Sequence, residues 1–231
     1  LITGAGGGLG RALARAFWRR GDNLVLADLD PALLDAVAQE LGDAGRIVRV
    51  AGDVTDPAHQ EELLVRAQAR FGGMSVLVNN AGITHRSPAA KTDPAVLRKV
   101  MEVDWQAPLE LALAALPQLQ AHSGAIVNIG SMAGFMPVLG RAFYCGAKAA
   151  LAQSFEVLRC EQRHLGIHVL MAYPSFLDTP IEANALGHDG QPARHARSTV
   201  GTPKDAGWMA ERIAVALEKR KRRVYSDRAS V

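Results

Sequence analysis

The sequence predicts a doubly wound α/β protein, in which a parallel sheet carries helices on both faces. Short β-branched runs alternate along the chain with longer helical patterns, and repeated strand–helix–strand units require right-handed crossovers. Several strands are continuous apolar runs, as is typical of strands that helices cover on both sides. The expected strands are residues 1–3, 23–27, 46–51, 75–79, 125–129, 168–172 and 223–226.

The starts of several helices are marked by an acid followed by a proline. Asp30, Asp56 and Asp93 each precede a proline, so that the acid can cap the helix and the proline can occupy its first position. Thr202 precedes a proline in the same way, and Asp205 then stands where a capping-box acid belongs. Long helices are expected over residues 93–121 and 142–164.

The composition fits one soluble globular domain that spans residues 1–231. Hydrophobic residues make up 48% and charged residues 21% of the chain, and the formal net charge is +3. The basic run at residues 219–223 lies where a helix is expected to end, and cations are stabilised there by the helix dipole. No aromatic residues or binding motif accompany this run, so we expect no nucleic-acid partner.

Disulfides, metal sites and membrane spans are not expected. Cys145 and Cys160, if one helix carries both, lie about 22 Å apart, which is too far for a disulfide and fits a reducing, cytoplasmic location. The histidines form no helical pair with a nearby acid, and no apolar run reaches transmembrane length. The sequence begins at Leu1 without a methionine, and a leader before it would not be visible.

The first strand leads directly into a glycine-rich turn, T-G-A-G-G-G-L-G at residues 3–10, and then into a helix. Its spacing, with Gly4, Gly8 and Gly10 as the fixed positions, differs from the common G-x-G-x-x-G fingerprint. Glycines here let backbone amides approach a pyrophosphate at the N-terminus of a helix. A plain tight turn is the alternative.

Asp28 strengthens the dinucleotide interpretation. It ends the second strand, where a carboxylate can accept hydrogen bonds from the adenosine ribose hydroxyls, whereas the alternative role of helix cap suits Asp30 better. The same carboxylate would repel a 2′-phosphate, no basic residue immediately follows it, and Gly7 gives the loop no basic side chain. We therefore expect NAD(H) to be preferred, with NADP(H) possible.

Further motifs gather where successive strands end, at the edge where open α/β sheets bind ligands. Y-x-x-x-K arises by chance in many helices, but its combination with the other motifs indicates one shared site. The motifs are Gly52-Asp53-Val54, Asn79-Asn80-Ala81-Gly82, the run 126–131 ending in Ser131, Tyr144-x3-Lys148, and Tyr173-Pro174-Ser175.

These motifs together resemble the short-chain dehydrogenases/reductases of the single-domain kind, over nearly the whole chain. The matching residues are 3–10, N-N-A-G at 79–82, Ser131, and Y-x-x-x-K at 144–148. The resemblance implies a Rossmann-type sheet of about seven parallel strands, a bound nicotinamide dinucleotide, and interconversion of an alcohol and a carbonyl. It also implies that Ser131, Tyr144 and Lys148 take the family's catalytic roles.

The resemblance further implies which residues contact the cofactor. Asp53 would contact the adenine, residues 79–82 would line the adenosine side, and Thr179 would hold the nicotinamide carboxamide. The complete expected set is Gly4, Gly8, Leu9, Gly10, Asp28, Asp53, Val54, Asn80, Ala81, Gly82, Tyr144, Lys148, Pro174, Leu177 and Thr179.

The chemistry of the residues supports the catalytic assignment independently. Tyr144 and Lys148 are four residues apart and share one face of a helix. A free tyrosine titrates near pH ~10, and a neighbouring ammonium is expected to lower that pKa toward the operating range. Ser131 can hydrogen-bond the substrate oxygen and hold it near Tyr144.

Two positions depart from the family pattern. Ser175 follows Pro174 where the family usually has glycine, which leaves Thr179 at its expected spacing. Asp104 stands where the family normally has a catalytic asparagine, thought to kink the helix while its backbone carbonyl holds a water that links the lysine to solvent. We count Asp104 among the catalytic residues and expect its charge to oppose formation of the tyrosinate.

The substrate is expected to be a moderately apolar alcohol or ketone. Specificity is assigned to residues 84–91 and to a substrate loop at about 180–201. An apolar segment after Ser131 either walls a substrate pocket or packs in the ordinary way; its members are Phe135, Met136, Val138 and Leu139.

Two other functional classes stay open, a nucleotide-binding sensor or scaffold with weak turnover and a sugar-nucleotide epimerase or dehydratase. The complete Ser–Tyr–Lys set opposes the first, and the length of the chain opposes the second. The resemblance implies a homodimer or homotetramer, formed through the alanine- and leucine-rich helices 93–121 and 142–164.

Overall fold

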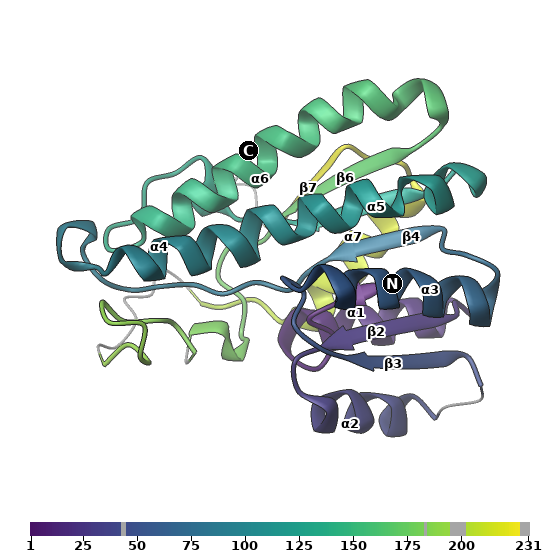
Figure 1. Ribbon diagram of the computed structural model, residues 1–231, viewed down its shortest axis with the longest axis horizontal. Coiled ribbons are helices and arrows are strands. Elements are labelled where there is room, and N and C mark those ends of the chain that lie inside the picture. The colour runs from purple at the N-terminus through teal and green to yellow at the C-terminus, as the bar shows by residue number, and fades with distance from the viewer. Residues whose placement is uncertain (43–44, 183, 195–201, 227–231) are drawn as a thin grey trace.

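The computed structural model of the protein describes residues 1–42, 45–182, 184–194 and 202–226. Its seven strands form one sheet in the order β3-β2-β1-β4-β5-β6-β7, and every neighbouring pair is parallel (Figure 1). The strands are β1 (Ile2–Thr3), β2 (Leu24–Asp28), β3 (Ile47–Ala51), β4 (Val76–Asn79), β5 (Ala125–Ile129), β6 (His168–Tyr173) and β7 (Arg223–Tyr225). The predicted doubly wound, Rossmann-type sheet is confirmed.

Helices cover both faces of the sheet (Figure 1). α1, α2 and α7 pack on one face around Leu13, Leu34 and Ile213. α3, α5 and α6 pack on the other face around Leu63 and Phe155. The helices are α1 (Gly8–Arg19), α2 (Pro31–Leu41), α3 (Pro57–Phe71), α4 (Pro94–Met101), α5 (Ala107–Ala121), α6 (Ala142–Gln162) and α7 (Ala206–Glu218).

The acid–proline helix starts form as predicted, with one correction. The carboxylates of Asp30, Asp56 and Asp93 each accept a hydrogen bond from the backbone N–H two residues later. α7 differs, because Asp205 is itself the cap and accepts from the Trp208 N–H at 2.7 Å. The assignment of the cap to Thr202 was wrong, and α7 begins three residues later than the proline motif suggested.

The predicted helix over residues 93–121 contains a π-helical turn, η2 (Glu102–Gln106), between α4 and α5. A π turn adds a residue to the helical ladder and changes the direction in which nearby side chains point. Asp104 lies inside this turn and is completely buried. The helix irregularity expected from the family resemblance is therefore present, although the residue is an aspartate.

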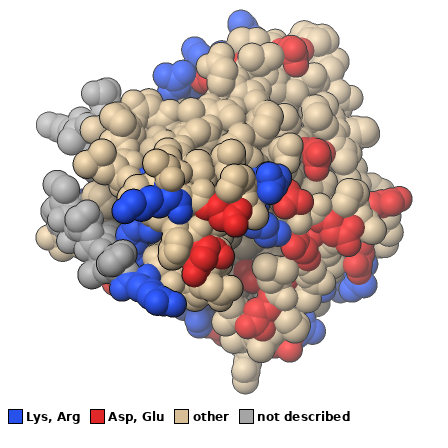
Figure 2. Space-filling model, turned by 60° about the vertical axis from the view of Figure 1, so that its left-hand side comes forward, with Lys and Arg blue, Asp and Glu red and all other residues tan. Residues whose placement is uncertain are grey.

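The chain order places the change of winding direction between β1 and β4, with β2 and β3 on one side and β5 to β7 on the other. Ligands of such sheets bind outside the carboxyl ends of the strands near this point. Figure 2 turns the side of α4 toward the viewer, and acidic and basic side chains border a hollow on that face.

Three further observations concern the described residues as a whole. No helix in them is long and apolar enough to cross a membrane. No group of three or more histidine, cysteine or acidic side chains is placed to hold a metal ion within this part of the chain. Cys145 and Cys160 are both free thiols.

Candidate active site

The glycine-rich turn forms a tight junction between β1 and α1. Gly4 and Gly8 have positive φ angles of 61° and 51°, a conformation that favours glycine. A Cβ atom on Gly10 would lie 1.9 Å from the Gly4 carbonyl oxygen, so no larger residue fits there. A Cβ on Gly7 would meet nothing within 4 Å, and Gly7 supplies no side chain to cap α1. The N-terminus of α1 thus has the shape and polarity that suit a phosphate.

Asp28 lies at the end of β2, directly beside this turn. Its Oδ2 accepts a hydrogen bond from the Gly6 N–H at 2.8 Å, and its Oδ1 accepts from the Asp30 N–H at 3.3 Å. The carboxylate is therefore fixed next to the glycine turn, as expected for a group that binds the adenosine ribose. Asp30 caps α2, so the two acids have the separate roles that the sequence suggested.

The N-N-A-G segment at the end of β4 holds the glycine turn in place by hydrogen bonds. The Asn80 amide donates to the carbonyl oxygens of Thr3 and Gly4 at 2.9 and 3.0 Å. The Thr3 hydroxyl accepts from the backbone N–H groups of Asn80 and Ala81, both at 3.0 Å. Thr3 is thus an anchor of the turn that sequence reasoning did not single out.

The side chain of Asn79 turns into the interior, unlike that of its neighbour Asn80. It is buried beneath the sheet edge, where its amide donates to the Pro108 carbonyl and to the Asn128 side chain at 3.1 and 2.9 Å. Successive side chains along a strand point to opposite faces of the sheet, so the side chain of Asn80 points to the glycine turn instead. In the N-N-A-G motif, Asn79 therefore belongs to the interior, whereas Asn80 hydrogen-bonds the glycine turn.

Asp53 follows β3 and is held in place by its neighbours. Its Oδ1 accepts from the Thr55 backbone N–H and hydroxyl at 2.9 and 2.8 Å, and its Oδ2 lies 3.6 Å from the Lys99 ammonium. The Thr55 hydrogen bonds and Lys99 hold the pKa of Asp53 below its usual value. Lys99, on α4, was not anticipated from the sequence.

Three of the expected cofactor-binding residues have side chains that pack in the hydrophobic cores, so only their backbone groups are left to contact a cofactor. Leu9 and Leu177 belong to the core packed around α1, and Val54 packs against the opposite core. Thr179 lies across the N-terminus of α1, since a Cβ on Gly8 would meet Thr179 at 3.2 Å. Pro174 directly follows β6, so the segment 174–179 runs from the strand end to the glycine turn.

The catalytic candidates meet at the carboxyl end of β5. Ser131 follows this strand, and Tyr144 and Lys148 project from the first turns of α6. The Lys148 ammonium lies 5.7 Å from the centre of the Tyr144 ring and donates to the Ile129 carbonyl at 3.1 Å. Tyr144 is 9% and Lys148 5% exposed, so the pair is largely shielded from water.

Asp104 completes this cluster from the π turn. One of its oxygens accepts a hydrogen bond from the Ile83 N–H at 2.7 Å, and the other lies 3.3 Å from the Lys148 ammonium. Burial raises the pKa of Asp104, which Lys148 and the Ile83 N–H oppose. Burial alone would lower the pKa of Lys148, but Asp104 and Tyr144 raise it above its usual value.

The pKa of Tyr144 is raised rather than lowered, which corrects the expectation from the sequence. Burial raises this pKa most, and Asp104 raises it further. Lys148 and a hydrogen bond with Ser131 lower it, as expected, but do not outweigh the other two causes. The sequence could not reveal this result, because desolvation depends on how completely the fold covers the phenol.

His85 and Arg141 border the same cluster; His85 lies in the segment 84–91 to which the sequence assigned specificity, whereas Arg141 was not anticipated. His85 is fully buried and stacks on Phe143, with ring centres 4.9 Å apart. Burial and Arg141 lower the pKa of His85 to about 4, so this imidazole is neutral at physiological pH. Arg141 donates to the Thr84 hydroxyl at 3.2 Å and also lowers the pKa of Tyr144 slightly.

The apolar segment after Ser131 is open to solvent rather than packed in the core. Phe135 and Met136 are 52% and 49% exposed, and Leu139 is fully exposed. Phe135 contacts Tyr173, the last residue of β6, edge to face with ring centres 5.4 Å apart. Ordinary interior packing therefore does not explain these side chains.

The fold and the arrangement of these residues are typical of dinucleotide-binding α/β oxidoreductases. A family model described as short chain dehydrogenase matches residues 1–189. The protein belongs to the short-chain dehydrogenase/reductase family.

Individual relatives agree with this placement. The chain is 36% identical to the cis-4-hydroxycyclohexanecarboxylate dehydrogenase of Sinomonas cyclohexanicum, over 93% of this chain and 86% of the relative. It is 32% identical to dehydrogenase/reductase SDR family member 7B of Bos taurus, over 97% of this chain and 71% of the relative. A solved short-chain dehydrogenase from Sphingobium yanoikuyae, in complex with NADPH, is similar with a TM-score of 0.84 at 29% identity, over 97% of this chain and 86% of that one.

Proposed function

We propose that this protein transfers a hydride between a nicotinamide dinucleotide, preferably NAD(H), and a secondary alcohol/carbonyl pair. The observation that carries the proposal is the cluster of the half-buried Ser131 with the buried Tyr144 and Lys148 beside the carboxyl end of β5. Its geometry brings a hydroxyl donor, a proton-transferring phenol and an ammonium to one place, as alcohol oxidation and carbonyl reduction require.

The residues of this chain fit a dinucleotide. Gly7 and the uncapped N-terminus of α1 suit the pyrophosphate, and Asp28 suits the adenosine ribose. Asp53 and Thr179 are further candidate contacts, toward the adenine and the nicotinamide carboxamide respectively. When bound, the cofactor supplies the acceptor or donor of the hydride.

The proton side of the reaction belongs to the protein. In the oxidative direction, the hydroxyl proton of the substrate passes to the tyrosinate of Tyr144 while the hydride leaves the carbinol carbon. Ser131 hydrogen-bonds the substrate oxygen and fixes its distance from Tyr144. Lys148 stabilises the tyrosinate electrostatically, and in the reductive direction the Tyr144 hydroxyl returns the proton to the carbonyl oxygen.

The proposed substrate is a moderately apolar secondary alcohol or the corresponding ketone. The exposed side chains of Phe135, Met136 and Leu139 support this class, because they follow Ser131 in the chain and are not packed in the core. The name of the Sinomonas cyclohexanicum relative describes a hydroxylated cyclohexane ring, which is a secondary alcohol, although that ring also carries a carboxylate. We further propose a cytoplasmic homodimer or homotetramer, which two free thiols and the half-exposed Leu113 on α5 support.

A substrate panel tests the function directly. Cyclic and linear secondary alcohols and their ketones are assayed with NAD(H) and NADP(H), and the absorbance of the reduced nicotinamide is followed. We expect turnover of at least one alcohol/ketone pair in both directions. Tight cofactor binding without turnover of any pair would instead favour a nucleotide-binding sensor.

A further inference from the structure

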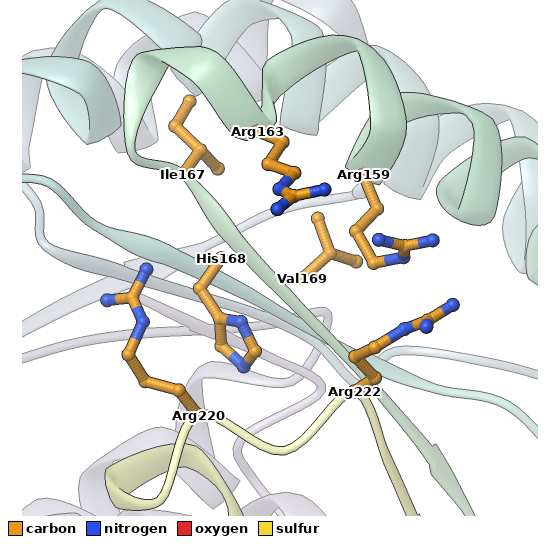
Figure 3. A pocket seen from close by; sticks show the side chains of 7 residues that line it. All are labelled: Arg159, Arg163, Ile167, His168, Val169, Arg220 and Arg222. Atoms are coloured by element: carbon orange, nitrogen blue, oxygen red, sulfur yellow. The ribbon is translucent and has the colours of Figure 1, made fainter.

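Several arginines line a pocket that is open to solvent (Figure 3). The cavity has a volume of about 370 Å³. We call it the arginine pocket and define it by its polar lining, which is Arg159, Arg163, His168, Arg220 and Arg222. Arg159 and Arg163 come from the end of α6 and the turn after it, and Arg220 and Arg222 come from the link between α7 and β7.

The arginine pocket lies at the amino ends of the strands, whereas the candidate active site lies at their carboxyl ends. His168 is the first residue of β6, and Tyr173 is its last. Arg159 lies about 22 Å along α6 from Tyr144, given the rise of an α-helix. A ligand in the pocket therefore contacts neither the cofactor nor the substrate.

The positive charge of the pocket is only partly balanced. Glu156 accepts from Arg159 at 2.8 Å and also pairs with Arg222 and Arg223 at 3.4 and 3.1 Å. One carboxylate thus serves three guanidinium groups. The structure pairs neither Arg163 nor Arg220 with a carboxylate within the described ranges, and Arg220 donates only to the Gly166 carbonyl at 3.1 Å.

The positive charge of the arginines affects the pKa of His168, whose imidazole lies in the pocket. His168 is 9% exposed, and its Nε2 lies 3.1 Å from the Lys221 carbonyl oxygen. Burial lowers the pKa of His168, and Arg220 and Arg159 lower it further, although the carbonyl contact raises it. An anion bound between these arginines would therefore raise the pKa of His168.

We propose that the arginine pocket is a second ligand site and binds a small molecule that carries a phosphate or diphosphate. Guanidinium groups hold phosphate oxygens through paired, charge-assisted hydrogen bonds. A volume of about 370 Å³ suits a small ligand, and the apolar side chains of Ile167 and Val169 close one wall. Arg163 and Arg220, which line the pocket together with His168, supply the charge that Glu156 does not neutralise (Figure 3).

Inorganic pyrophosphate is a suitable probe, used with protein already saturated with cofactor so that the glycine turn is not available. Calorimetry at constant ionic strength measures its affinity, and proton NMR follows the titration of His168, whose signal is assigned with a His168→Gln variant. The test variant is Arg163→Gln/Arg220→Gln. The control, Arg66→Gln/Arg98→Gln, removes the same charge from exposed positions on α3 and α4.

We expect pyrophosphate to raise the pKa of His168 in the wild type and in the control. In the test variant, the affinity should fall by about tenfold or more, as expected when charge-assisted hydrogen bonds are lost. Equal affinity in the two variants, or an unchanged His168 titration, would overturn the proposal. Tighter, arginine-dependent binding of an oligonucleotide would also overturn it and point to nucleic acid, and a change of oligomeric state in the test variant would point to a subunit contact.

Discussion

The carboxylate of Asp104 and the ammonium of Lys148 form a buried ion pair, 3.3 Å apart, and the ammonium lies 5.7 Å from the centre of the Tyr144 ring. Asp104 is completely buried and its second oxygen is held by the Ile83 N–H, so the charge cannot turn away. This arrangement stabilises the protonated lysine but opposes a second negative charge on the tyrosine. The balance between these effects sets the pH at which Tyr144 can accept a proton.

Replacing Asp104 by asparagine should therefore move the pH dependence of the reaction. Because burial and, to a lesser extent, Asp104 raise the pKa of Tyr144, the wild-type oxidation rate should increase only at high pH, where the tyrosinate forms. In Asp104→Asn this increase should occur at lower pH, and activity near neutrality should equal or exceed that of the wild type. Profiles of kcat and kcat/KM against pH measure the shift.

Glu102→Gln is the matched control for Asp104→Asn. It removes the same charge from the same π turn, but at a side chain that is 47% exposed, so its profile should coincide with that of the wild type. Thermal unfolding shows whether Asp104→Asn remains folded, since loss of one member of a buried pair can cost about 3–5 kcal/mol. A folded but inactive Asp104→Asn protein, or an unshifted profile, would contradict the argument.

Tyr144→Phe should abolish most of the activity while leaving the fold intact. The ring keeps its packing against Lys148, but the hydroxyl that transfers the proton is gone. Turnover should fall by about 100-fold or more, as is typical when general acid–base catalysis is lost. Cofactor affinity, measured by fluorescence of the reduced nicotinamide, should stay close to the wild-type value. Substantial remaining turnover would assign proton transfer to another group.

Cofactor choice depends on Asp28. The wild type should show the higher kcat/KM with NAD(H), because this carboxylate would repel the 2′-phosphate of NADP(H). Asp28→Asn keeps the shape and the hydrogen-bonding capacity toward Gly6 but removes the charge. The ratio of the two kcat/KM values should then move toward NADP(H) by about tenfold or more. A wild-type preference for NADP(H), the cofactor in the similar Sphingobium yanoikuyae structure, would contradict the role of Asp28.

Assembly should depend on the outer side of α5 and α6. Leu113 and Val157 are 48% and 47% exposed there, whereas Leu111 is buried in the core. We expect sedimentation of the wild type to give a dimer or tetramer, and Leu113→Glu to shift it toward smaller species. Val65→Glu, at a similarly exposed position on α3, should leave the assembly unchanged. A wild-type monomer at micromolar concentration would contradict the prediction.

Local sequence patterns predicted most of the fold. Each strand begins and ends within one residue of its predicted bounds. Continuous apolar runs flanked by glycine and acid–proline motifs leave little choice of where a strand begins and ends. The caps at Asp30, Asp56 and Asp93 formed as expected, since capping needs only the next few residues. The same reasoning misplaced the cap of α7, where Asp205 competed with Thr202 for the role.

The candidate site was predictable in its members but not in its electrostatics. Spacing along α6 was enough to bring Tyr144 and Lys148 together. The raised pKa of Tyr144 depends on burial by distant segments, and the inward direction of Asn79 depends on its partners Pro108 and Asn128. The arginine pocket brings residues 159–169 together with Arg220 and Arg222, more than fifty positions later in the chain, so no local sequence pattern predicts it.

The contact between α1 and α7 has a consequence for the synthesis of the protein. α1 begins at the glycine turn near the start of the chain, yet its apolar side packs against Met209 and Ile213, which are among the last residues described. Ion pairs of Arg19 and Arg20 with Glu211 hold the same two helices together. A nascent chain on the ribosome therefore carries the uncovered face of α1 until α7 emerges, and only then can the dinucleotide-binding half of the molecule close its core.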